Sequence, residues 1–116
     1  MNKKTIIILE DDTELSELFR VSLESAGFHV IVQSNSRDIC DLIDQHKADL
    51  VITDMVMPEY EGMEGIVKVV NQYNVPIIAI SQHAEYLHVV ETIVTMCLQK
   101  PITTDRLLQT VSQILQ

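Results

Sequence analysis

Short runs of apolar, mostly β-branched residues recur at five places along the chain. They cover residues 5–10 (TIIILE), 28–33 (FHVIVQ), 49–53 (DLVIT), 76–81 (PIIAIS) and, more weakly, 96–100 (MCLQK). Within each run the apolar residues follow one another instead of alternating with polar ones, which favours strands covered on both faces. The pattern therefore predicts buried strands at these positions.

Between the runs, apolar residues recur at roughly 3.6-residue intervals, as they do along helices that cover a core. The stripes consist of Leu15, Leu18, Phe19, Leu23 and Ala26; of Ile39, Leu42 and Ile43; of Met63, Ile66, Val67 and Val70; and of Leu107, Leu108, Val111, Ile114 and Leu115. Gly27 follows the first stripe, where it would end the helix. Residues 84–94 are apolar on too many sides for a simple amphipathic helix, although Leu87, Val90 and Val94 fit one stripe.

Strands that alternate with helices predict an α/β fold, with a doubly wound, five-stranded parallel sheet and right-handed crossovers. A chain of 116 residues is long enough for one core but too short for two, so we expect residues 1–116 to form one domain. Ligands of such sheets bind at the carboxyl ends of the strands. Candidate functional residues are therefore those that follow the predicted strands.

Acids, a hydroxyl and a lysine lie at these strand ends. They are Glu10, Asp11, Asp12, Asp54, Ser81 and Lys100. Taken singly, each has an ordinary structural interpretation as a helix cap, a turn residue or a solvated end. Together they predict a site, because clustered carboxylates repel one another unless a cation lies among them. Oxygen ligands suit Mg²⁺, and a carboxylate nucleophile with a lysine and a hydroxyl beside it would serve phosphoryl transfer.

Composition and charge argue against several classes of function. A net charge of −9 argues against a nucleic-acid-binding surface on this chain. No stretch approaches the roughly 20 apolar residues of a membrane span. The run from Ile6 to Leu9 is followed at once by acids, so we expect neither membrane insertion nor a secretion signal. Cys40 and Cys97 fit no metal or disulfide spacing, which indicates reduced thiols in a cytoplasmic protein.

Four motifs at the strand ends together resemble the receiver domain of two-component response regulators. They are ILEDD (8–12), DMVMPEYEGME (54–64), PIIAIS (76–81) and LQKP (98–101). The resemblance spans nearly the whole chain and implies a flavodoxin-like (βα)5 fold with strand order 2-1-3-4-5. It implies that Asp54 accepts a phosphoryl group from the phosphohistidine of a sensor histidine kinase or histidine phosphotransfer protein. The chain would then be a signalling switch of a phosphorelay and not a turnover enzyme.

The resemblance also implies a Mg²⁺ site. Asp11 would bind the ion directly, and Glu10 would bind it directly or through water. Asp54 and the backbone carbonyl of Val56 would complete the protein ligands. Asp12 lies outside the matching acidic pair and is predicted to cap the following helix.

Further roles follow from the same resemblance. Lys100 would pair with Asp54 in the unmodified protein and with the phosphoryl group afterwards. Ser81 would be the switch hydroxyl, which turns to hydrogen-bond the phosphoryl group and draws the adjoining loop inward. The Lys100–Pro101 peptide would be cis. Pro58 and Gly62 would shape the loop after Asp54.

Three features depart from the family pattern. Cys97 occupies the position where the family usually has Tyr or Phe, and Tyr86 in the neighbouring helix does not match that motif. Gln82 follows the switch hydroxyl where Ala or Gly is common, and it would either shield the acyl phosphate or orient a hydrolytic water. The third and fourth βα units are short by about three residues against the family pattern, so we expect a shortened or irregular fourth helix.

The segment around the fourth helix leaves two questions open. Tyr86, Val89 and Ile93 are either buried or singly exposed, or they form an exposed strip for a downstream protein or a second copy. The latter would use the face formed by the fourth helix, fifth strand and fifth helix, through which receivers commonly signal. His83 is either a surface residue or a modulator of phosphoryl lifetime.

Three other protein classes compete with this interpretation. A haloacid-dehalogenase-type phosphatase would place a second Asp at position 56, where this chain has Val56, and its nucleophile on the first strand. A flavodoxin would need a glycine-containing phosphate loop after the first strand, but EDDTELS has no Gly. A receiver-like binding module that works without phosphorylation remains the main alternative.

Overall fold

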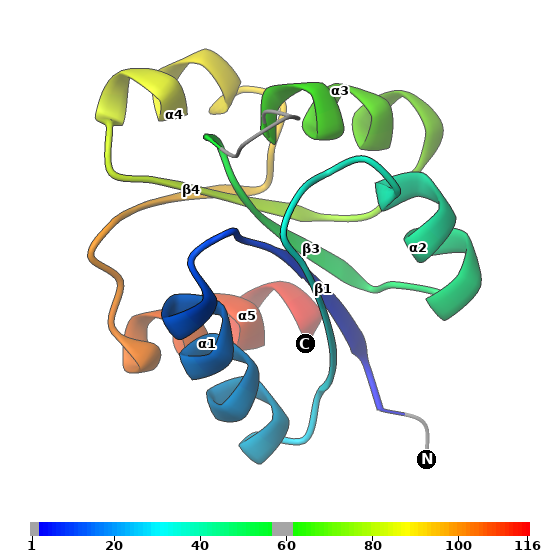
Figure 1. Cartoon of the computed structure of the whole chain (residues 1–116), viewed down its shortest axis with the longest axis vertical. Coiled ribbons are helices and arrows are strands. Elements are labelled where there is room, and N and C mark those ends of the chain that lie inside the picture. Colours follow the sequence, from blue (N-terminus) through cyan, green and yellow to red (C-terminus); the bar gives the residue numbers. More distant parts are fainter. Residues whose placement is uncertain (1–2, 57–61) are drawn as a thin grey trace.

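The computed structural model describes residues 3–56 and 62–116. Within them, five parallel strands form one sheet in the order β2-β1-β3-β4-β5 (Figure 1). The strands are β1 (Thr5–Leu9), β2 (His29–Gln33), β3 (Leu50–Asp54), β4 (Ile77–Ser81) and β5 (Met96–Gln99). The predicted fold class and strand order are confirmed.

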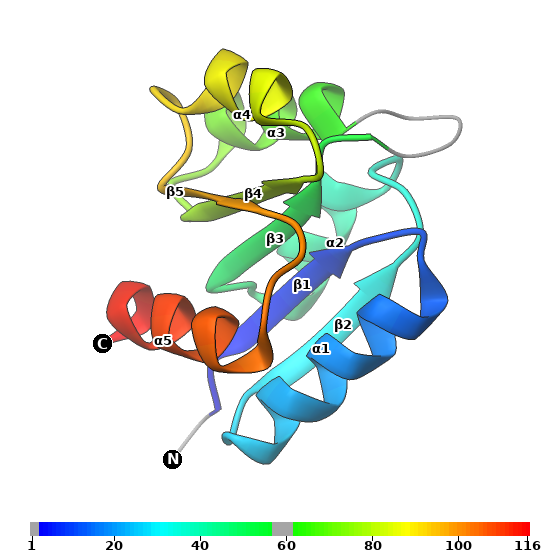
Figure 2. The same cartoon turned by 90° about the vertical axis from the view of Figure 1, so that its left-hand side faces the viewer.

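Helices cover both faces of this sheet. They are α1 (Thr13–Ser25), α2 (Ile39–His46), α3 (Gly62–Gln72), α4 (Ala84–Val90) and α5 (Thr104–Leu115). Figure 2 shows α1 and α5 on one face, with α2, α3 and α4 on the other. Within the described residues, no helix combines the length and the apolar character needed to cross a membrane.

The two helical layers explain why the strands are apolar at successive positions. Ile6 and Ile8 pack in the same cluster as Phe19 of α1, whereas Ile7 between them packs with Ile39 of α2. All five side chains are at most 1% exposed. Burying an aliphatic side chain of this size stabilises the fold by about 1.5–3 kcal/mol. Each strand thus connects two cores.

The limits of α1 follow from its flanking residues. The Asp12 carboxylate accepts hydrogen bonds from the backbone N–H groups of Glu14 and Leu15, both at 3.1 Å, which confirms Asp12 as the helix cap. Gly27 lies just beyond the helix with a φ of 99°, a conformation that favours glycine. Leu18, expected in the buried stripe, is 50% exposed.

The predicted stripe of α3 is only partly correct. Ile66 and Val69 are each 1% exposed, whereas Val67 and Val70 are 43% and 41% exposed. Apolar spacing selects one side of a helix, but the sheet covers an arc of only about 100° of it. Ile66 and Val69 lie within that arc and Val67 and Val70 lie at its edge.

Helix α4 has seven residues, as expected of a shortened fourth helix. Leu87 and Val90 are buried at 7% and 0% exposed, and Val94 packs against the same core. Val89 and Ile93 are 62% and 44% exposed. A short helix on one face of a sheet can bury only one of its sides, which explains this division between buried and exposed residues.

Candidate functional site

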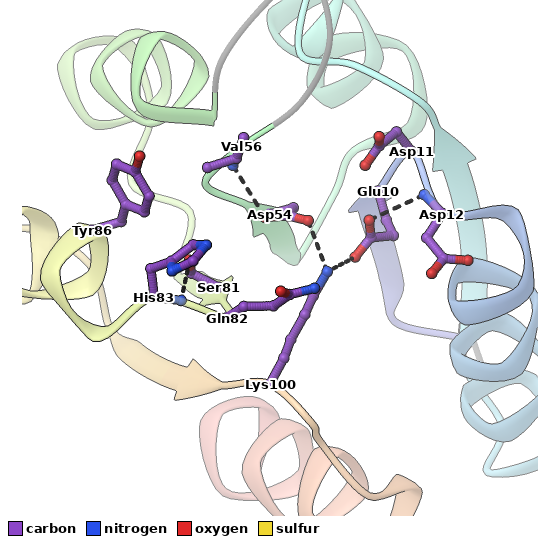
Figure 3. Close-up of a pocket in the computed structure, with 10 residues that line it drawn as sticks. All are labelled: Glu10, Asp11, Asp12, Asp54, Val56, Ser81, Gln82, His83, Tyr86 and Lys100. Carbon is purple, nitrogen blue, oxygen red and sulfur yellow. Dashed lines mark hydrogen bonds and ion pairs between the residues drawn. The ribbon is translucent and has the colours of Figure 1, made fainter.

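The carboxyl ends of β1, β3, β4 and β5 meet at one edge of the sheet and form a pocket there. The parallel register places Asp54 opposite Ile80 and Ser81 opposite Gln99, so the strand ends are level. The pocket has a volume of about 350 Å³ and is lined by Glu10, Asp11, Asp12, Asp54, Val56, Ser81, Gln82, His83, Tyr86 and Lys100 (Figure 3). Every predicted site residue lines it. Pro58 lies outside the described residues.

Lys100 holds two carboxylates of this pocket together. Its Nζ donates to Glu10 Oε1 at 2.7 Å and to Asp54 Oδ2 at 2.8 Å (Figure 3). The three side chains are 13%, 0% and 9% exposed, so the ion pairs are shielded from water. The Lys100–Pro101 peptide at the end of β5 is cis, as expected. Sequence analysis predicted the pair with Asp54 and missed the pair with Glu10.

Glu10 is a strongly perturbed acid. Its pKa is raised to about 7, mainly by burial and to a smaller extent by the nearby Asp54 carboxylate. Hydrogen bonds from Lys100 and from the backbone N–H of Asp12 act in the opposite direction and do not offset the burial. Burial of the Lys100 ammonium works to lower its pKa, but the hydrogen bonds to Asp54 and Glu10 prevail and leave that pKa raised.

The acids of the pocket fit a divalent cation. Glu10, Asp11 and Asp54 each offer a carboxylate oxygen, and these oxygens lie within 4.8 Å of one another. Lys100 contacts two of the three carboxylates and leaves Asp11, which is exposed, without an ion pair among the described residues. A set made only of oxygen donors is typical of Mg²⁺, which keeps several water ligands. Val56 borders the same space, and its N–H donates to Asp54 Oδ1 at 3.1 Å.

Ser81 ends β4 with its side chain turned toward the backbone. It is 1% exposed, and its hydroxyl oxygen accepts a hydrogen bond from the N–H of His83 at 3.0 Å. Its carbonyl accepts from the N–H of Lys100 at 2.8 Å. The main chain of Ser81 is therefore fixed between the strands, whereas its hydroxyl can turn about one bond.

The Response regulator receiver domain model matches residues 6–112 of the sequence. The chain belongs to the response regulator receiver family. The matched residues include all four strand ends that form the pocket, so the acidic site lies within the receiver domain.

Relatives and solved structures agree with this assignment. The probable C4-dicarboxylate response regulator DctR of Priestia megaterium is 32% identical, over 97% of this receiver and 53% of DctR. The polar-differentiation response regulator DivK of Brucella anthropi is 27% identical, over 97% of this receiver and 96% of DivK. The chemotaxis response regulator CheY4 of Vibrio cholerae has the same fold, with a TM-score of 0.88 at 21% identity over 97% and 99% of the two chains. This receiver spans about half the length of DctR but nearly all of DivK.

Tyr86 is the pocket residue that sequence analysis set aside. It does not match a receiver motif, yet it lines the pocket from the first turn of α4. Cys97, at the usual aromatic position, is absent from the pocket lining and packs, partly buried, against the core beneath α4. The short separation of Tyr86 from Ser81 in the sequence could have indicated this position, because residues in the first turn of the next helix lie close to the strand end.

The raised pKa of Glu10 predicts how Mg²⁺ affects stability at different pH values. The folded receiver holds this proton more tightly than the unfolded chain, so Glu10 by itself makes the free energy of unfolding fall between pH 4.5 and about 7. A cation bound by this carboxylate would compete with the same proton. We therefore expect Mg²⁺ to raise Tm more at about pH 8 than at about pH 5.5.

Thermal unfolding with and without Mg²⁺ at the two pH values measures this difference. Glu10→Gln removes the titrating group and should make the Mg²⁺-induced shift smaller and less dependent on pH. An equal shift for the unaltered protein at both pH values would contradict the assignment of Glu10 as a ligand whose proton competes with the metal.

Proposed function

We propose that this receiver accepts a phosphoryl group on Asp54 in a Mg²⁺-dependent reaction and thereby changes a partner-binding face. One observation carries the proposal: Lys100 contacts Asp54 at 2.8 Å inside a pocket where the oxygens of three carboxylates lie within 4.8 Å of one another. A phosphorylation-independent binding module would have no use for such an arrangement, since clustered acids destabilise a fold.

Each residue of the pocket would have its own role in the reaction. An oxygen of Asp54 attacks the phosphorus of a phosphohistidine that is protonated on its other ring nitrogen. The phosphorus–nitrogen bond breaks, and the imidazole leaves as the neutral base that keeps this proton. Lys100 is placed to pair with the oxygens of the transferred group, which carry the negative charge of the transition state. Glu10, Asp11, Asp54 and the carbonyl of Val56 would hold Mg²⁺, which supplies further charge neutralisation.

Ser81 would report the modification. Turned toward Asp54, its hydroxyl can donate to a phosphoryl oxygen, so that a group of about −2 charge biases the position of the neighbouring loop. The donor would be a sensor histidine kinase or a histidine phosphotransfer protein. The output would be a downstream protein or a second copy bound on α4, β5 and α5, where Val89 and Ile93 are exposed.

This proposal describes a switch and not a turnover enzyme, because the phosphoryl group ends on the protein itself. It treats residues 1–116 as one receiver domain acting in the cytoplasm, where the two cysteines would stay reduced. It assigns no nucleic-acid contact to a chain of net charge −9.

The test is incubation of the protein with Mg²⁺ and a small acyl phosphate donor, followed by intact-mass spectrometry and peptide mapping. We expect the mass of one phosphoryl group, located on the peptide that contains Asp54, and its loss when Mg²⁺ is chelated. An adduct on another residue, or no adduct together with no Mg²⁺ binding by calorimetry, would refute the proposal.

Gln82 is predicted to protect the modified protein from hydrolysis. It is exposed at the rim of the pocket, directly after Ser81, where a small residue would leave the phosphoryl group open to water. We expect Gln82→Ala to shorten the lifetime of the phosphorylated state by up to about tenfold, equivalent to ~1.4 kcal/mol in the barrier. The decay of the phosphoryl mass after removal of the donor measures the lifetime.

Gln109→Ala on α5 is the matched control, because Gln109 is exposed and is not among the residues that line the pocket. It should leave the lifetime unchanged. A longer lifetime in Gln82→Ala would show instead that the Gln82 amide orients the hydrolytic water.

A further inference from the structure

His83 and Tyr86 form an aromatic pair on the side of the pocket opposite the acids (Figure 3). Their ring centroids lie 5.6 Å apart with the planes at 80°, an edge-to-face contact. The N–H of Tyr86 also donates to the carbonyl of His83 at 3.1 Å. The two residues therefore form one unit, made of His83 at the N-cap of α4 and Tyr86 in its first turn.

The backbone N–H of His83 is hydrogen-bonded to the switch hydroxyl of Ser81. The N–H of His83 donates to Ser81 Oγ at 3.0 Å, and the His83 side chain makes no capping hydrogen bond to the helix. Ser81 is 1% exposed, whereas Tyr86 is 44% exposed. The bond thus joins the buried Ser81 hydroxyl to the backbone of His83, whose ring contacts the partly exposed Tyr86.

Cys97 does not offer an alternative connection. Its Sγ lies 3.7 Å from the carbonyl of Leu87, to which the thiol donates, and its side chain packs in the core beneath α4. It is absent from the pocket lining, where His83 and Tyr86 are the aromatic residues. Cys97 is therefore not placed in the pocket where the Ser81 hydroxyl would turn.

We propose that His83 and Tyr86 are positioning residues that transmit the orientation of the Ser81 hydroxyl to α4. The inference rests on the proposed phosphorylation of Asp54. When Ser81 turns to donate to a phosphoryl oxygen, its Oγ moves away from the N–H of His83. The N-cap then loses a hydrogen bond, and the His83–Tyr86 pair shifts with the first turn of α4.

The length and surroundings of α4 make such a shift feasible. A helix of seven residues has less than two turns of internal hydrogen bonds, so its position depends on its end contacts. Tyr86 and Val89 lie three residues apart, on the same exposed side of the helix. Movement of Tyr86 therefore changes the exposed apolar side of α4 and not only the pocket.

A single-tyrosine form of the protein tests the proposal. The chain has three tyrosines and no tryptophan, so Tyr60→Phe with Tyr73→Phe leaves Tyr86 as the only tyrosine fluorophore. Mg²⁺ and a small acyl phosphate donor are added, and Tyr86 emission and its quenching by acrylamide are followed. Intact-mass spectrometry of the same samples gives the fraction of protein modified on Asp54.

We expect emission and quenching to change in proportion to the modified fraction. At the same modified fraction, Ser81→Ala in this background should lose that change, because it lacks the hydroxyl. His83→Ala should reduce the change, because the ring that contacts Tyr86 is gone while the backbone N–H that bonds Ser81 remains. Cys97→Ser is the matched control and should keep the full change, since its hydroxyl can still donate to the carbonyl of Leu87.

The possible outcomes separate the two proposals. A phosphoryl adduct without any change at Tyr86, or with the same change in Ser81→Ala, would overturn the coupling and leave the phosphorylation intact. A failure to form the adduct in the background protein would overturn the proposed function, and the coupling with it. Where Ser81→Ala takes up too little phosphoryl group, beryllium fluoride with Mg²⁺ replaces the donor, and its binding is measured by calorimetry.

Discussion

Asp54→Asn is expected to abolish phosphoryl uptake while the protein stays folded. The amide has no oxygen nucleophilic enough to attack phosphorus, but its carbonyl oxygen can still accept the hydrogen bond that Lys100 donates to Asp54 at 2.8 Å. Removal of one charge from a cluster of three carboxylates also relieves repulsion among them. Intact mass after incubation with Mg²⁺ and a small acyl phosphate should show no adduct, and Tm should not fall.

Asp12→Asn provides the matched control. Asp12 borders the same pocket and undergoes the same chemical change, but its carboxylate accepts backbone hydrogen bonds at the start of α1. Asn caps helices about as well as Asp does, so this variant should form the adduct at the normal rate. Uptake by Asp54→Asn, or its loss in Asp12→Asn, would mean that the wrong carboxylate has been assigned as the acceptor.

Lys100→Met is expected to cause the largest loss of stability. The side chains of Lys100, Glu10 and Asp54 are 13%, 0% and 9% exposed, so removal of the ammonium leaves two shielded carboxylates without their cation. Breaking a buried ion pair in this way costs about 3–5 kcal/mol. We expect a loss of that size in urea unfolding at about pH 8 without Mg²⁺, together with a large loss of phosphoryl uptake.

The same variant should be rescued by two different treatments. Lower pH protonates Glu10, whose pKa is already raised to about 7 by burial, and this protonation removes one of the two uncompensated charges. Mg²⁺ supplies positive charge at the same place. The deficit relative to the unaltered protein should therefore shrink under either condition.

Lys68→Met is the control that distinguishes the loss of the buried Lys100 ion pairs from the loss of a lysine charge in general. Lys68 Nζ lies 4.0 Å from Glu64 Oε1, and the two side chains are 40% and 55% exposed. A solvated pair of this kind contributes little, so we expect a change below about 0.5 kcal/mol that depends weakly on pH and Mg²⁺. Equal losses in the two variants would contradict the central role given to Lys100.

Much of the fold could be predicted from the sequence because local patterns reflect it directly. Continuous β-branched runs such as the one containing Ile6, Ile7 and Ile8 indicate strands buried on both faces. Asp12 and Gly27 mark the limits of α1 through hydrogen-bonding and backbone preferences that act over a few residues. Parallel strands must end at one edge, so the gathering of Glu10, Asp54 and other strand-end residues followed from the parallel sheet that the alternating pattern predicted.

The exposed arcs of the helices could not be predicted in the same way. Spacing placed Val67 and Val70 in one stripe with Ile66, but they are exposed because the rotation of α3 on the sheet is set by its neighbours. The same reason applies to Leu18 of α1. A periodic pattern defines a side of a helix, and packing decides how much of that side is covered.

The details of the site depended most on contacts that are distant in sequence. Lys100 and Glu10 are separated by 90 positions, and their 2.7 Å contact and the raised pKa of Glu10 arise only when β1 and β5 are placed around β3 and β4. Likewise, Tyr86 reaches the pocket because the first turn of α4 lies against the end of β4. Residue types and the predicted parallel sheet indicated which groups gather at this edge. Burial and orientation, which determine charge, nucleophilicity and coupling, exist only in the folded chain.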